Sequence, residues 1–113
     1  MNTSRSDFPN DDDGEVLYQL AKKGIDLSQK RKIEFTCYAP SEEVAQQVVD
    51  DLATYGYTSS VFVDDHDGKP RTVSIYAAIT MILEYELVVI EQRRLNLILK
   101  KYNTKCDGWV TES

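Results

Sequence analysis

Residues 31–43 read RKIEFTCYAPSEE, and within them an alternating pattern changes directly into a helix start. Ile33, Phe35 and Cys37 fall on one face, while the residues between them fall on the other. A period of two over this length predicts a strand with one buried face. Ser41 precedes two acids, a combination that predicts the N-cap and first turn of a helix.

The same signals order the rest of the chain, because caps and terminal glycines bound helices and β-branched or aromatic runs mark strands. The helix that starts at Ser41 carries one apolar stripe, made of Val44, Val48, Leu52 and Tyr55. We expect, in chain order, a helix over 13–23 that ends at Gly24, a strand over 31–39, a helix from Ser41 to Gly56, strands over 57–64 and 71–82 joined by a hairpin turn at 65–70, a helix over 84–102 and a short strand within 105–111.

A helix followed by the order β-α-β-β-α-β predicts an α+β protein with a ferredoxin-like fold. That fold is an antiparallel sheet with two helices on one face, here with an additional N-terminal helix. Its first and last strands are neighbours, which would bring Cys37 and Cys106 near each other as reduced thiols. The length suits one domain, over 10–113, preceded by a flexible N-terminal arm over 1–9.

The chain is acidic, with 13 Lys+Arg against 19 Asp+Glu and a formal net charge of −6. A negative field argues against broad electrostatic binding to nucleic acid or to anionic lipid. The excess is concentrated in segments 7–15 and 64–67. No secretory signal opens the chain, and no stretch reaches the roughly 20 apolar residues of a membrane span. We therefore expect a cytoplasmic protein without membrane contact.

No residue pattern predicts catalysis, a metal site or a cofactor. The acidic turn at 64–67 cannot start an EF-hand, because Lys69, Pro70 and Tyr76 stand where that loop needs oxygen ligands or glycine. His66 is the only histidine, which excludes a multi-histidine metal site. It lies in a predicted turn while both cysteines lie in predicted strands, so a Cys-His nucleophile is not expected either.

A sheet covered by helices on one side leaves its second face free for a partner. Tyr38 and Tyr76 fall on that face, and we expect Trp109 to join them. Aromatic side chains are common anchors in protein interfaces. Acidic segments suit a basic protein partner, because complementary fields speed encounter. The acids expected to contribute are Asp11, Asp12, Asp13, Asp64, Asp65 and Asp67.

The sequence also allows other occupants of this sheet face. An RNA-recognition domain has the same order of elements and stacks bases on sheet aromatics. The third strand reads TVSIYAA at 72–78, without the basic, glycine-rich and aromatic signature of that domain, so direct nucleic-acid binding is disfavoured. A small molecule, or a second copy that pairs sheet faces as a homodimer, is a further alternative.

Several short runs together resemble one known family. Phe8-Pro9 is followed by DDGEVL at 12–17, IEF at 33–35, SEE at 41–43, Gly56-Tyr57 and Asp107-Gly108-Trp109. From Phe8 to Thr111 the chain resembles the regulator of ribonuclease E activity B family. The resemblance implies a small, acidic, ferredoxin-like protein without catalytic activity. It also implies a partner, the endoribonuclease ribonuclease E, whose activity such proteins lower by direct contact and which acts in RNA turnover.

Overall fold

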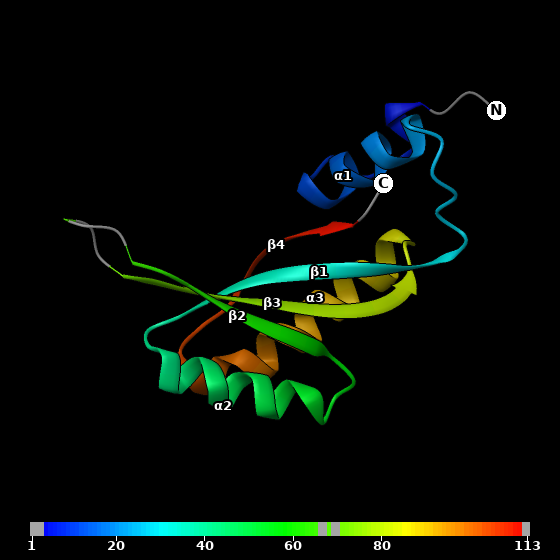
Figure 1. Cartoon of the computed structure of the whole chain (residues 1–113). Coiled ribbons are helices and arrows are strands. Elements are labelled where there is room, and N and C mark those ends of the chain that lie inside the picture. The colour runs from blue at the N-terminus through cyan, green and yellow to red at the C-terminus, as the bar shows by residue number, and fades with distance from the viewer. Residues whose placement is uncertain (1–3, 66–67, 69–70, 112–113) are drawn as a thin grey trace.

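The computed structural model describes residues 4–65, 68 and 71–111. The four strands form one antiparallel sheet in the order β2-β3-β1-β4 (Figure 1). The α+β fold, with a helix ahead of a βαββαβ order, confirms the prediction from sequence. The elements are η1 (Arg5–Asp7), α1 (Asp12–Lys22), β1 (Lys30–Ala39), α2 (Glu42–Ala53), β2 (Thr58–Asp64), β3 (Thr72–Ile82), α3 (Tyr85–Leu99), η2 (Lys100–Tyr102) and β4 (Cys106–Thr111).

Strand β1 lies inside the sheet and pairs with β3 along its whole length, from Lys30 opposite Ile82 to Ala39 opposite Val73. Its other edge pairs with β4. The apolar residues of the predicted alternation are fully buried on one face of β1. The period of two therefore separates a helix-covered face from a second face, as the sequence predicts.

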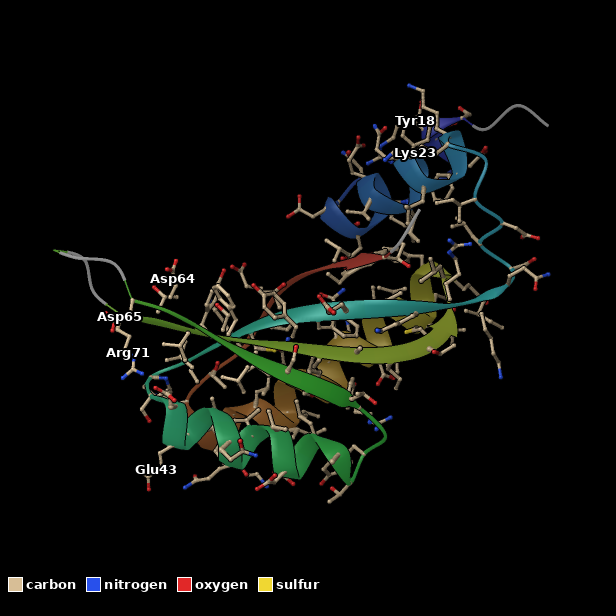
Figure 2. The ribbon with its side chains drawn as sticks, viewed as in Figure 1. Tyr18, Lys23, Glu43, Asp64, Asp65 and Arg71 are labelled. Atoms are coloured by element: carbon tan, nitrogen blue, oxygen red, sulfur yellow. The ribbon has the colours of Figure 1, made fainter. Side chains whose placement is uncertain are left out.

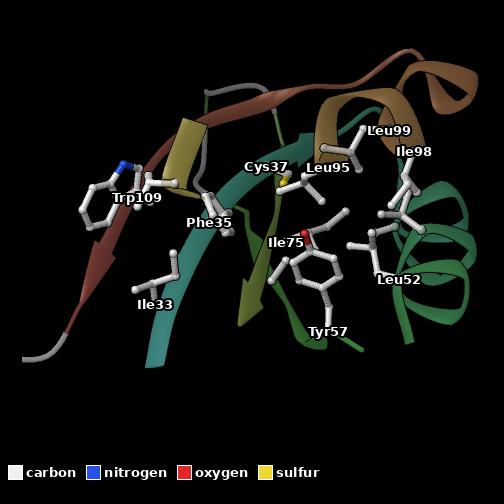
Figure 3. Close-up of a cluster of buried hydrophobic side chains, with 14 of the residues drawn as sticks. Ile33, Phe35, Cys37, Leu52, Tyr57, Ile75, Leu95, Ile98, Leu99 and Trp109 are labelled. Carbon is white, nitrogen blue, oxygen red and sulfur yellow. The ribbon is translucent and has the colours of Figure 1, made fainter. Parts of the chain in front are cut away.

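The helices divide the covered face between them. Helix α2 contacts β2 and β3, α3 contacts β4, and α1 packs against α3. Figure 1 shows α1 at the β4 end of the sheet and α2 at the β2 end. Figure 3 shows Phe35 and Trp109 at one end of the resulting core, with Leu52, Tyr57 and Leu95 toward α2.

Cap hydrogen bonds mark the starts of the first two predicted helices. The Ser41 hydroxyl accepts from the Val44 backbone N–H at 3.2 Å, and an Asp11 carboxylate oxygen accepts from the Gly14 N–H at 2.8 Å. At the far end of α2, Gly56 has φ 93°, in the left-handed region that glycine enters without steric cost.

One prediction for the α2 stripe is wrong. Ala45, Val48 and Leu52 are completely buried, whereas Tyr55 is 45% exposed. The Arg94 guanidinium lies 5.7 Å from the Tyr55 ring centroid, so the ring packs against a cation at the surface instead of entering the core.

The expected N-terminal arm is held against α1 over residues 4–9. Arg5 donates from Nε to Glu15 Oε2 at 2.7 Å, and from Nη1 to the carbonyls of Phe8 and Pro9 at 3.1 and 2.9 Å. Phe8 packs against the core. Arg5 thus ties residues 4–9 to α1. Residues 1–3 lie outside the described part of the chain.

Candidate functional site

The sheet face away from the helices, here called the open face, carries two exposed aromatic rings in one row. Tyr38 on β1 lies opposite Ser74 on β3, and Ser74 lies opposite Phe62 on β2. Tyr38 is 46% exposed and Phe62 is 57% exposed. Because neighbouring strands are about 5 Å apart, the two rings flank a small residue across roughly 10 Å of sheet.

Tyr76 occupies the next row of the open face, with Thr36 on one side and Ser60 on the other. It is half-buried, so it contributes less free ring surface than Tyr38. The alternation of β1 and β3 therefore places Tyr38 and Tyr76 on the same face, as expected. Their role in partner binding stays a prediction.

Phe62 is not among the contacts predicted from sequence, although it is the more exposed ring of the row. Val61 and Val63 flank it, and this apolar run hides which face each residue takes. The β2–β3 register supplies the missing information, because Asp64 opposite Thr72 puts Phe62 opposite Ser74.

Acidic side chains stand at the hairpin end of this face. Asp64 follows Phe62 by two positions and therefore shares its face. Asp65 is exposed directly after it. Figure 2 shows Asp64 and Asp65 at this end of β2, with Arg71 beside them. Asp67, also a predicted contact, lies outside the described residues.

The predicted place of Trp109 on the open face is wrong. Trp109 is only 6% exposed and lies opposite Phe35, on the helix-covered face of β1 (Figure 3). The cause is a bulge in β4: Phe35 pairs with Trp109 and Cys37 with Cys106, so two residues of β1 span three of β4. Gly108, with φ 86°, supplies the left-handed backbone that this bulge needs.

Asp13, another predicted partner contact, is half-buried and hydrogen-bonded within the chain. Its Oδ1 accepts from the Trp109 indole Nε1–H at 2.9 Å. Its Oδ2 accepts from the Gln92 side-chain amide, also at 2.9 Å. One carboxylate thereby joins α1, α3 and β4.

Asp11 has an internal role as well, although it is exposed like Asp12. The Tyr85 hydroxyl donates to Asp11, and so does the Gly14 N–H. These two donors, the hydroxyl first, hold the pKa of Asp11 below its ordinary value. Asp11 and Asp12 are both exposed, and their role in partner contact stays a prediction.

Cys37 and Cys106 are opposite each other across β1 and β4, and both are free thiols. Burial, with a smaller effect from Cys106, raises the pKa of Cys37 to about 12. Burial also raises the pKa of Cys106 to about 11. Since the thiolate is the reactive form, neither sulfur is poised for nucleophilic chemistry at neutral pH.

The described residues hold no group of three or more His, Cys, Asp and Glu side chains that could bind a metal ion. Over the same part of the chain, no helix has the length and apolar character needed to cross a membrane. The open face therefore presents aromatic rings among small polar residues, with carboxylates at one end.

Comparison with known proteins identifies the family. The family model described as regulator of ribonuclease activity B matches residues 10–111, which is nearly the whole domain. No curated protein matches the chain. The family is one of regulators and not of catalysts. The chain therefore belongs to the regulator of ribonuclease activity B family.

Proposed function

We propose that this protein lowers the activity of an endoribonuclease of the ribonuclease E type by binding it directly. The observation that carries the proposal is the family match over residues 10–111, since it names regulation of a ribonuclease. A regulator without its own catalysis acts through contact, so the proposal requires a surface that can hold a protein partner.

The open face supports such a contact. Tyr38 and Phe62 expose large rings on either side of the buried Ser74, and a partner would pack against these rings. Rigid aromatic side chains contribute much of the binding energy in protein interfaces because they bury a large area with few rotatable bonds. Tyr76 extends the same surface toward the middle of the sheet.

The charge at the edge of this face favours a basic segment of the nuclease. Asp64 shares the face of Phe62, and Asp65 is exposed beside it. Acids at the rim of an interface raise the rate of association with a cationic partner more than they raise its final affinity.

The proposal is tested with purified ribonuclease E and a fluorogenic RNA substrate. We expect the protein to bind the nuclease and to slow cleavage, with association faster at low ionic strength. Absence of binding at low salt together with unchanged cleavage would contradict the proposal. Binding of an RNA oligonucleotide to the protein alone, at the same sites, would instead favour direct RNA recognition.

Substitution on the open face is expected to separate binding from folding. Tyr38→Ala and Phe62→Ala should each weaken nuclease binding by about tenfold or more, because each removes an exposed aromatic anchor. Tyr55→Ala is the matched control, since Tyr55 is 45% exposed, close to the 46% of Tyr38, but lies in the turn after α2 and not on the sheet. Equal losses in all three variants, measured by titration calorimetry, would exclude the open face as the contact.

A further inference from the structure

The structure holds an open surface cavity of about 630 Å³ at the C-terminal end of α3. This volume lies in the range of binding sites for small ligands and peptide side chains. Its lining comes from α3, from η2 and from the loop that leads into β4, and none of it belongs to the open face of the sheet. The lining residues are Arg93, Asn96, Leu97, Lys100, Asn103, Thr104 and Lys105.

Hydrogen bonds fix the two walls of this cavity. Asn103 ends η2 in the left-handed conformation, with φ 59°, and turns the chain back beside α3. The Thr104 N–H donates to the Leu99 carbonyl at 3.3 Å, and the Cys106 N–H donates to Asn96 Oδ1 at 2.7 Å. The cavity is therefore preformed, so a ligand would not have to order the loop in order to bind.

The charge of the cavity is opposite to that of the whole protein. Arg93, Lys100 and Lys105 are exposed along its lining, and no carboxylate lines it. Among the described residues, no ion pair involves any of these three cations. A chain with a net charge of −6 thus places three cations around one hollow, and none of them is in an ion pair with another described residue.

The surface between these charges is largely apolar. Leu97, 74% exposed, is the most exposed large hydrophobic side chain among the described residues. Ile90, 57% exposed, stands seven positions earlier on the same side of α3. An exposed apolar side chain among three cations complements an acidic segment that carries an apolar side chain.

We infer that this cavity is a docking site for an acidic peptide segment of a protein partner, with an apolar side chain against Leu97 and carboxylates on Arg93, Lys100 and Lys105. The apolar lining favours a peptide over an RNA backbone, because sequence-tolerant RNA binding uses aromatic rings for base stacking and none lines the cavity. The inference does not depend on the proposed function, since it concerns a different surface.

A labelled synthetic peptide of glutamate and leucine, titrated against the purified protein by fluorescence polarisation, tests the inference. We expect saturable binding that weakens about tenfold in Lys100→Glu and in Lys105→Glu, as each reversal turns an attraction into a repulsion. Leu97→Ala should weaken binding several-fold without changing the charge. All three side chains are exposed, so thermal unfolding should be unchanged in the variants.

Lys23→Glu is the matched control, because it makes the same charge change on exposed Lys23 at the end of α1, well away from this cavity (Figure 2). Binding that falls equally in Lys23→Glu, or that is absent, would overturn the inference. Tighter binding of a single-stranded RNA oligonucleotide, indifferent to Leu97→Ala, would overturn it in favour of a phosphate-binding surface. No ribonuclease enters this experiment, so its failure would leave the proposed function untouched.

Discussion

Asp13 is a single side chain that connects three elements of the fold. Its two carboxylate oxygens accept from the Trp109 indole and from the Gln92 amide, and so fasten the first helix to the rest of the protein. A buried indole N–H without an acceptor carries the full cost of its lost hydration. The acidic start of α1 therefore stabilises the fold through Asp13, while Asp11 and Asp12 are exposed.

Asp13→Ala is expected to lower the free energy of unfolding by about 1–3 kcal/mol, because it leaves two donors without their acceptor. Trp109 is the single tryptophan, so urea unfolding followed by its fluorescence measures the change directly. Asp12→Ala serves as the control and should stay within about 0.5 kcal/mol of the parent. Equal stability of the two variants would show that the Asp13 bridge contributes nothing.

The two thiols are expected to be unreactive in the native state. Cys37 is fully buried, and burial raises the pKa of both sulfurs, to about 12 and about 11. At pH 8 a thiol-specific disulfide reagent should modify the folded protein far more slowly than the protein in urea. Rapid native modification of either cysteine, located by mass spectrometry, would contradict this prediction.

At the scale of elements, the bulge in β4 explains the principal error of the sequence analysis. Cys106 and Trp109 are three residues apart, so a regular strand would point them to opposite faces. A regular β4 with Cys106 beside Cys37 would therefore carry Trp109 on the open face, where it was expected. The extra residue at Gly108 turns Trp109 to the covered face, and no alternation pattern reveals a bulge in a six-residue strand.

Local signals predicted most of the remaining elements. Ser41 and Gly56 bound α2 as expected, because caps and left-handed glycines depend only on neighbouring residues. The exposure of the Tyr55 ring could not be predicted from sequence, since it depends on a contact with Arg94 from α3, far along the chain. The cavity at the end of α3 was missed for the same reason, because its walls join only in the folded protein.

The close contact between α1 and the segment ahead of it makes Gly14 a sensitive position. A Cβ atom there would stand 2.0 Å from the Pro9 carbonyl oxygen, a clash with backbone that no rotamer relieves. Gly14→Ala is expected to displace residues 4–9 and to destabilise the domain by about 1–3 kcal/mol. Faster tryptic cleavage at Arg5, compared with the Asp12→Ala control, would report the displacement; unchanged cleavage and stability would contradict it.

At the scale of the whole molecule, carboxylates tie distant segments together. Asp51 of α2 accepts from the Tyr102 hydroxyl at 2.9 Å and forms an ion pair with Lys101. The Lys101 ammonium, followed by that hydroxyl, lowers the pKa of Asp51. Hydrogen bonds likewise lower the pKa of Asp11, Glu15 and Asp26. In each case folding favours the charged form.

Stability is accordingly expected to depend on acid pH. A carboxylate with a lowered pKa in the folded state stabilises the protein above its unfolded value, near pH 4, and this contribution is lost as the pH falls through the folded value. The urea midpoint should change little from pH 7 to 5 and drop below about pH 4. Asp51→Asn should reduce the midpoint at pH 7 and converge with the parent at pH 2; parallel curves would contradict the assignment.

The order β2-β3-β1-β4 also bears on how the chain reaches its native state. The last strand pairs with the first, so β1 keeps a bare hydrogen-bonding edge until β4 arrives. Unpaired edges are sites of aberrant association between chains. Pairing between strands so far apart in sequence is also slow, because closing the intervening loop costs conformational entropy before the stabilising contacts between the strands form. During synthesis, the nascent domain therefore stays open until its final segment emerges, and this interval is when it is most prone to aggregate.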